Sequence, residues 1–209
     1  MSFVFALAAI VIAYLLGSLP MGVLAARIVK GVEIREVGSG RTGATNAYRA
    51  AGPWGLALTS LGDICKGIAA VWVARFLIYL APASSTAWVE TLAGIAAVVG
   101  HNWSIFLRFK GGAGTATTVG VLAAMNVYVA IGVTGAGIVA LAIARMASIA
   151  SITVAVLMGI VLAIVAATGH GPWAHVAFGL VGGTLTIWAL RPNIGRIVQK
   201  EERRLKTNY

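Results

Sequence analysis

Long apolar runs recur along this chain, and each is about as long as a helix that crosses a bilayer. A transmembrane helix needs about 20 apolar residues, and five segments meet that description: 3–26, 54–80, 87–107, 148–167 and 173–190. Hydrophobic residues make up 59% of the 209 residues, more than a soluble domain of this size can bury. The sequence therefore predicts an all-α membrane protein with a single integral membrane domain over 1–209. The first run is longer than the apolar part of a signal peptide, so we expect it to be retained as a span.

The stretch 115–143 is too long for one relaxed span and short for two, and the basic residues decide between these options. Lys and Arg follow the first and third runs, precede the fourth at Arg145 and fill the tail, whereas the connectors 81–87 and 168–172 contain neither. Cytoplasmic loops carry an excess of Lys and Arg. If the stretch forms two short helices that turn near Asn126, every basic loop lies on one side. We therefore predict seven transmembrane helices, with the N-terminus outside and the C-terminus in the cytoplasm.

The charge balance and the single cysteine limit which partners and cofactors this protein can be expected to bind. Lys and Arg outnumber Asp and Glu by 16 to 6. This excess suits cytoplasmic loops, an anionic lipid surface or an anionic substrate. It does not suit nucleic acid, because the basic residues are not gathered on a soluble domain. The single cysteine, Cys65, lies in an apolar run and is expected to be a small core residue. No metal-ligand cluster is visible, so neither a metal nor another cofactor is expected.

The segment GSGRTGATNAYR (38–49) is unusually polar for this chain. Glycine lets a backbone adopt positive φ and approach a ligand closely, and consecutive amides in such a loop can bind an anion. Hydroxyl and amide side chains add donors, and arginine suits phosphate. The groups concerned are Gly38, Gly40 and Gly43, then Ser39, Thr42, Thr45 and Asn46, then Arg41 and Arg49. The segment predicts an anion cradle; a flexible interfacial turn is the alternative.

A second glycine-rich loop, GGAGTAT (111–117), opens onto a predicted helix. Amides at a helix N-terminus favour a phosphate group or a developing oxyanion. His101 precedes this loop and is suited to proton transfer, to donation toward an anion, or to a structural hydrogen bond. These three roles stay open.

Ionisable residues also lie inside the predicted spans, where they are costly and need a partner or a wet cavity. Asp63 and Lys66 are three residues apart and so share a helical face, which predicts a structural ion pair or a group that reaches the polar cavity. Arg75 is expected to extend outward, and Glu90 to be interfacial. The segment ARMASIAS (144–151) places two serines at a helix start. No Ser-His-Asp arrangement is visible, so an enzyme of this kind would act by electrostatics and positioning.

These segments together resemble the bacterial acyl-phosphate:glycerol-3-phosphate acyltransferases, the PlsY family, nearly end to end. The matching motifs fall in family order: GSLP (17–20), EIREVGSGRTGATNAYRAAG (33–52), DICKG (63–67), GHNWSIFLRFKGGAGTAT (100–117), ARMASIAS (144–151) and RPNIGRI (191–197). The resemblance implies a seven-helix protein of the bacterial plasma membrane whose active site faces the cytoplasm. It implies acyl transfer from acyl phosphate to the 1-hydroxyl of glycerol 3-phosphate, without direct use of coenzyme A or acyl carrier protein.

The resemblance also assigns the site. The catalytic residues would be His101, Ser39, Asn193 and Ser148. The phosphate-binding residues would be Gly38, Ser39, Gly40, Arg41, Gly43, Thr45, Asn46, Arg49, Gly111, Gly112, Gly114, Thr117 and Arg196. Glu202 matches a family glutamate in the tail. A phosphate oxygen of the donor would accept the hydroxyl proton, with His101 as the alternative base.

Several positions depart from the family pattern. Ala113 stands where a phosphate-binding lysine is usual, Arg41 replaces an asparagine, Ser104 a proline, Leu190 a histidine and Lys200 a glycine. If both glycine-rich loops face one cavity, Arg41 supplies the cation that Ala113 lacks. The alternatives are a paralogue with another acceptor or weak activity, and a membrane protein that binds or transports anions. Transport needs a path to the far side, whereas the polar residues here are predicted to lie on one face.

Overall fold

The computed structural model describes residues 2–80 and 86–205, and every regular element within them is helical. In chain order the elements are α1 (Ser2–Ser18), α2 (Met21–Lys30), η1 (Ile34–Glu36), α3 (Ala44–Leu80), α4 (Thr86–Asn102), η2 (Ile105–Leu107), α5 (Thr115–Met125), α6 (Val127–Ala144), α7 (Ala147–Ala167), α8 (Trp173–Ala189) and α9 (Arg191–Val198). The all-helical prediction is confirmed for these residues. Lys206 of the basic tail and most of the 81–87 connector lie outside them.

Proline and glycine divide two of the apolar runs. The run 3–26 is interrupted at Pro20, which has no N–H to continue the hydrogen bonds of a helix, and it forms α1 and α2. Helix α3 bends at Gly52, whose φ of 68° is open to glycine at little cost, and Pro53 follows the bend. The part of α3 beyond the bend corresponds to the predicted run 54–80.

The stretch 115–143 forms two helices, as predicted. Helix α5 ends at Met125 and α6 begins at Val127, with extended backbone at Asn126 between them. Asn126 Oδ1 accepts hydrogen bonds of 3.1 Å from the backbone N–H groups of Tyr128 and Val129, which caps the start of α6.

Among the residues that the structure describes, three segments are long and apolar enough to cross a membrane, namely Phe3–Lys30, Val127–Ala144 and Ala147–Ala167. Helices α8 and α9, bent by 61° at their junction, make a fourth if they are taken together. With 11 residues, α5 is about 16 Å long, shorter than the hydrocarbon core of a bilayer. These helices support a multi-pass membrane protein.

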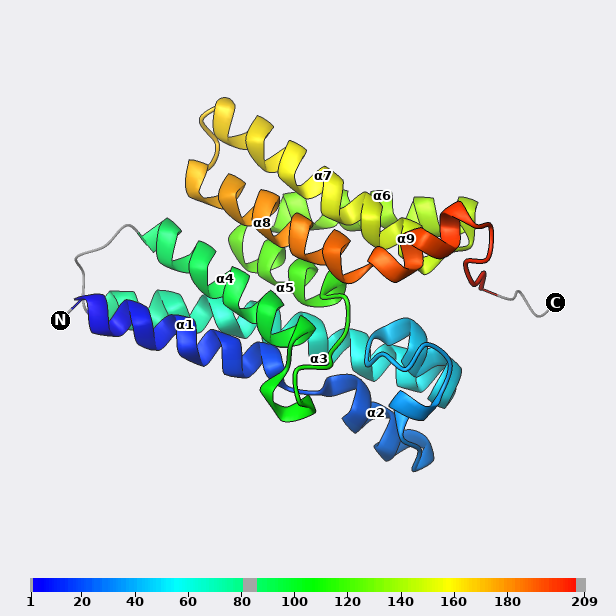
Figure 1. Ribbon diagram of the computed structural model, residues 1–209. Coiled ribbons are helices and arrows are strands. Elements are labelled where there is room, and N and C mark those ends of the chain that lie inside the picture. Colours follow the sequence, from blue (N-terminus) through cyan, green and yellow to red (C-terminus); the bar gives the residue numbers. More distant parts are fainter. Residues whose placement is uncertain (1, 81–85, 206–209) are drawn as a thin grey trace.

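The helices pack in two groups joined by α4 and α5 (Figure 1). Helix α4 contacts α1 on one side and α8 on the other, and α5 contacts α3 and α6. Helix α1 approaches α4 so closely that a Cβ on Gly100 would overlap the carbonyl oxygen of Tyr14. Small residues allow such close contacts between membrane helices. Phe178 of α8 and Leu122 of α5, two of the largest fully buried side chains, belong to one hydrophobic core that also includes residues of α1, α3, α4 and α7.

The prediction that Cys65 is a core residue was wrong, because its side chain is exposed. Helix α3 buries Asp63 and Lys66 on its inner face, and a helix turns by about 100° per residue, so position 65 falls on the outer face. Large apolar side chains such as Trp72 and Tyr79 are exposed on the same helix, as expected for a surface in contact with lipid.

Arg75 and Glu90 form a partly buried ion pair between α3 and α4, in which the Arg75 side chain is 28% exposed, and their expected positions relative to the membrane stay predictions. Arg75 Nε donates to Glu90 Oε1 at 2.9 Å, and His175 Nε2 of α8 lies 3.2 Å from Glu90 Oε2. The Glu90 side chain is only 8% exposed. Glu90 therefore links three helices. An unpaired charge inside a membrane protein is strongly destabilising, so a buried carboxylate is expected to have partners.

Replacing Glu90 with alanine should cost much more stability than replacing Glu33, a glutamate whose arginine partners are exposed. The variant leaves Arg75 partly buried without its partner, which costs about 3 kcal/mol in the free energy of unfolding. Glu33 pairs with Arg27, whose side chain is 62% exposed, so Glu33→Ala should cost about 1 kcal/mol or less. Denaturant titrations in mixed micelles would compare the two variants; equal losses would mean that the buried link contributes no more than the surface pair.

Candidate active site

A cavity of about 380 Å³ lies where the two glycine-rich segments meet α7 and the C-terminal tail. Most of the predicted site residues line it, namely Ser39, Arg41, Gly43, Thr45, Asn46, Arg49, His101, Gly114, Ser148 and Asn193. The others do not line it: Gly38, Gly40, Gly111, Gly112, Thr117 and Arg196. Polar segments far apart in the sequence therefore meet in one cavity.

The cavity also has an apolar side. Its walls there come from α5, α6 and α7, and the residues are Val119, Gly137, Ile138, Leu141 and Val154. One cavity thus combines a polar, basic region with a region suited to a hydrocarbon chain.

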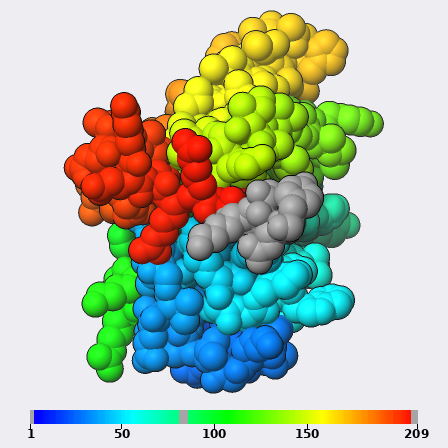
Figure 2. Space-filling view, turned by 90° about the vertical axis from the view of Figure 1, so that its right-hand side faces the viewer, coloured from blue at the N-terminus to red at the C-terminus, as the bar shows by residue number. Residues whose placement is uncertain are grey.

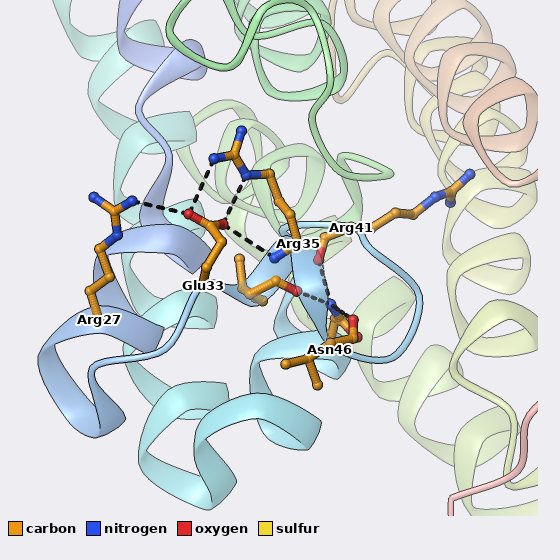
Figure 3. Close-up of polar contacts among 7 residues, drawn as sticks. Arg27, Glu33, Arg35, Arg41 and Asn46 are labelled. Carbon is orange, nitrogen blue, oxygen red and sulfur yellow. Dashed lines mark hydrogen bonds and ion pairs between the residues drawn. The ribbon is translucent and has the colours of Figure 1, made fainter.

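The first glycine-rich segment is held together from inside by Asn46, in the first turn of α3 (Figure 3). Its Nδ2 lies 2.9, 2.9 and 2.8 Å from the carbonyl oxygens of Ile34, Val37 and Arg41. Its Oδ1 accepts from the Ser39 N–H at 3.0 Å. The polar atoms of Asn46 are thus used to shape the loop. Gly38 and Gly40 supply positive φ angles of 57° and 69° at its turns.

Arg41 reaches out of this loop toward the end of α8. Its guanidinium donates to the carbonyl oxygen of Ala189 and, at 3.3 Å, to Asn193 Oδ1. Figure 3 shows its side chain pointing away from Glu33 and from the two arginines that pair with that residue, Arg27 and Arg35. Burial lowers the pKa of Arg41, and the charges of nearby arginines lower it further. Arg41 therefore lies in the same cavity as Ala113 and not in bulk solvent.

The second glycine-rich loop folds back onto the end of α4. The N–H groups of Gly111 and Gly112 donate at 3.1 Å to the carbonyl oxygens of Asn102 and His101, so these amides are already paired. The cavity is instead lined by residues 113–116 at the start of α5. The first N–H groups of a helix have no partner within it, which makes this the anion-binding part of the loop. Thr117 is fully buried behind it.

The predicted ion pair between Asp63 and Lys66 is present, with 2.7 Å between Lys66 Nζ and Asp63 Oδ1. His101 joins it, because its Nδ1 lies 2.9 Å from Lys66 Nζ and 3.4 Å from Asp63 Oδ1. All three side chains are buried, and Asp63 and His101 line the cavity. Both interpretations of the pair thus hold, since it is an ion pair and one member reaches the cavity.

The C-terminal tail lies across the cavity and is tied down by Glu202. This carboxylate accepts hydrogen bonds of 2.9 Å from Ser148 Oγ, 2.7 Å from Asn193 Nδ2 and 2.9 Å from Arg196 Nε. The N–H of Leu205 then donates to the carbonyl oxygen of Arg145. In Figure 2 the red tail lies between the blue and the yellow-green parts of the face. Ser148 and Asn193 line the cavity while they hold the tail, and Arg196 only holds the tail.

Glu202 should make the attachment of the tail depend on pH. Burial alone raises the pKa of Glu202, but hydrogen bonds from Asn193, Ser148 and Arg196 outweigh it and hold the pKa below its ordinary value of 4.5. A lowered pKa stabilises the folded protein above the unfolded pKa, and the effect is lost as the pH falls through the folded pKa. The thermal midpoint of Glu202→Gln should therefore lie a constant amount below wild type at neutral pH and approach it in acid. A gap that persists in acid would show that the charge is not responsible.

Some lining residues were missed by sequence reasoning. Ser60 lies one helical turn before Asp63, so its spacing was a usable signal. Arg203 and Thr134 carried no local signal, since the tail and the centre of α6 line the cavity only after packing. Within the described ranges no group of three or more His, Cys, Asp or Glu side chains is arranged to hold a metal ion.

Comparisons with known proteins agree with this geometry. Residues 7–200 match the family described as glycerol-3-phosphate acyltransferase. Relatives with that name include those of Gloeobacter violaceus, 41% identical over 90% of this chain and 89% of the relative, and of Trichormus variabilis, 39% identical over 93% and 89%. The crystal structure of PlsY, an integral membrane glycerol 3-phosphate acyltransferase, in its glycerol 3-phosphate form has a TM-score of 0.84 at 35% identity, covering 97% of this chain and 96% of that one. The lysophosphatidic acid form gives 0.83 at 34%, with the same coverage. Likeness over nearly the whole length, in sequence and in fold, means that this chain belongs to the glycerol-3-phosphate acyltransferase family.

Proposed function

We propose that this protein transfers a fatty acyl group from acyl phosphate to the 1-hydroxyl of sn-glycerol 3-phosphate. The products are lysophosphatidic acid and inorganic phosphate. The observation that carries the proposal is the two-sided cavity, which offers amides and arginines at one end and apolar walls at the other. The related PlsY structures are described as glycerol 3-phosphate and lysophosphatidic acid forms, which correspond to the acceptor and the product.

The two phosphate groups bind at the polar end. The free amides at the start of α5 hold one anion, and Arg41 and Arg49 supply charge from the first glycine-rich segment. Ser39, Ser148 and Asn193 orient the reacting groups. The acyl chain lies along Val119, Ile138, Leu141 and Val154, so its carbonyl meets the polar groups where the two regions join.

The reaction needs no covalent enzyme intermediate. The acceptor hydroxyl oxygen attacks the carbonyl carbon of acyl phosphate, the bond from that carbon to the phosphate oxygen breaks, and phosphate leaves. A phosphate oxygen takes the hydroxyl proton. Positioning the hydroxyl against the carbonyl lowers the barrier, and fixed donors stabilise the oxyanion.

In this proposal seven helices cross the membrane, namely α1 and α3 through α8, and the site faces the cytoplasm. The short helix α5 crosses where the bilayer is locally thinned. The placement of Lys and Arg supports this topology, because the connector 168–172 has neither residue, whereas the loops around the cavity are basic. Cysteines placed at His170 and at Arg108 in a Cys65→Ser background test it with an impermeant maleimide. Labelling of position 170 from the cytoplasmic side would contradict it.

The test of function is an assay of purified protein with palmitoyl phosphate and glycerol 3-phosphate that measures phosphate and lysophosphatidic acid together. We expect both products in equal amounts, and none from palmitoyl coenzyme A. Arg27→Ala, on the surface away from the cavity, serves as the control and should be fully active. Phosphate release only with another acceptor would identify a paralogue, and anion binding without turnover would favour an anion-binding protein.

A further inference from the structure

A buried cluster of three side chains determines which ring nitrogen of His101 carries a hydrogen. Asp63 and Lys66 are one turn apart on α3, His101 is in the last turn of α4, and none of their side chains is more than 6% exposed. Lys66 Nζ lies 2.7 Å from Asp63 Oδ1, 2.9 Å from His101 Nδ1 and 3.0 Å from the carbonyl oxygen of Leu19. His101 Nδ1 also lies 3.4 Å from Asp63 Oδ1, so Lys66 Nζ is its nearer polar neighbour.

The shared proton stays on Lys66. An ammonium group can donate to the Leu19 carbonyl oxygen and to His101 Nδ1 while it forms an ion pair with Asp63. A primary amine is on the order of 10⁴-fold more basic than an imidazole, the two side chains are similarly buried, and Asp63 Oδ1 lies closer to Lys66 Nζ (2.7 Å) than to His101 Nδ1 (3.4 Å), so a proton between them belongs to the amine. A charged imidazole is excluded as well, because it would place a second positive charge 2.9 Å from Lys66 Nζ with one carboxylate to balance both. His101 Nδ1 must accept, so the ring is neutral and its hydrogen is on Nε2.

The Nε2 edge of the ring faces the second glycine-rich loop. A Cβ on Gly112 would overlap Nε2, and the Gly112 N–H donates to the backbone oxygen of His101. The residues that follow, 113–116, line the same cavity as His101. A hydrogen on Nε2 is therefore held against Gly112, the residue next to the anion-binding part of this loop.

We propose that Lys66, held in place by Asp63, is a positioning residue that fixes His101 as an Nε2–H donor at the cavity. His101 then donates to a phosphate oxygen or to the oxyanion that forms as the carbonyl is attacked. It cannot take the proton of the acceptor hydroxyl, so that proton goes to the phosphate of the donor. This inference rests on the proposed function, but the state of the ring can be measured without turnover.

Nitrogen NMR of the full-length protein in lipid bilayers, labelled with ¹⁵N-histidine, tests the protonation state directly. The chain has 3 histidines, and the spectrum of His101→Gln assigns the signal of His101 by difference. We expect a protonated Nε2 and an unprotonated, hydrogen-bonded Nδ1 at neutral pH. A hydrogen on Nδ1, or on both nitrogens, would overturn the proposal even if acyl transfer is observed.

Two substitutions of His101 test the role in turnover. Glutamine can donate a hydrogen bond but cannot act as a base, whereas leucine can do neither. We expect His101→Gln to keep a kcat at least about tenfold above His101→Leu, the effect of a hydrogen bond that forms to a charged group. Equal loss in both variants, together with a wild-type kcat that falls as histidine is protonated in acid, would assign His101 as the base.

The double variant Asp63→Asn/Lys66→Met tests the positioning role, because it removes both charges and leaves none unpaired. In this variant the NMR signal of a protonated Nε2 in His101 should disappear. The fall in kcat should be larger than the rise in KM. A double variant that keeps the wild-type signature and kcat would contradict a role for Lys66. If the wild-type protein shows no acyl transfer at all, the proposed function fails, and the NMR result still stands on its own.

Discussion

Replacing Asn46 with alanine should abolish acyl transfer and destabilise the protein. The Asn46 side chain is 3% exposed and bonds to Ile34, Val37, Arg41 and Ser39, so alanine would leave several buried backbone groups without partners. Each such group costs about 1–3 kcal/mol. We expect a loss of at least about 3 kcal/mol in stability and of at least about 100-fold in kcat/KM, because the loop that carries Arg41 loses its internal support.

Two further variants sharpen this test. Asn46→Asp keeps the size of the side chain but has no N–H to donate to the carbonyl oxygens around Nδ2, so it should be as damaging as alanine. Asn126→Ala is the matched control, since that asparagine also bonds to backbone N–H groups but caps α6 away from the cavity. It should cost about 1 kcal/mol and leave kcat/KM near wild type. Full activity of Asn46→Asp would refute the role assigned to the amide donor.

Arg41→Ala should reduce kcat/KM by roughly 10- to 100-fold, the effect of losing one hydrogen bond to a charged group. The guanidinium lies in the cavity and crosses from the first glycine-rich segment to Ala189 and Asn193. The variant removes a cation that attracts phosphate and also frees Asn193. The loss should appear mainly in KM for the phosphorylated substrates if Arg41 binds them equally in the ground and transition states. The same assay that measures lysophosphatidic acid reports it.

The double variant Arg41→Ala/Ala113→Lys asks whether Arg41 replaces the lysine that is usual in the family. Ala113 lines the same cavity, so a lysine there can return a positive charge to the polar end. We expect it to recover at least tenfold of the loss seen in Arg41→Ala. Arg35→Ala is the matched control, because Arg35 pairs with Glu33 outside the cavity. No recovery, with Ala113→Lys active by itself, would show that the two positions do not substitute for one another.

Local features of the fold were predictable because they depend on neighbours in the sequence. The apolar runs and the spacing of Asp63 and Lys66 each follow from a few adjacent residues. The helix boundary near Asn126 was predicted differently, from the distribution of basic residues along the whole chain. The prediction that the glycine-rich segments meet came from the distribution of basic residues, and the cavity brings them together. The hydrogen-bond partners of individual backbone groups were less predictable. Gly111 and Gly112 were expected to bind phosphate, but their N–H groups are paired with carbonyl oxygens at the end of α4.

The sequence by itself determined that this chain is helical and suited to a membrane, and which residue types collect in its polar segments, because hydropathy and helix-breaking residues act locally. Only the tertiary structure decided the partners. Glu90 joins Arg75 and His175, Lys66 joins His101, and Glu202 joins Ser148, in each case across different helices or the tail. The physical reason is that a buried charge must be paired, while the geometry of helix packing selects the partner. Sequence shows that such a partner is needed, and packing shows which one it is.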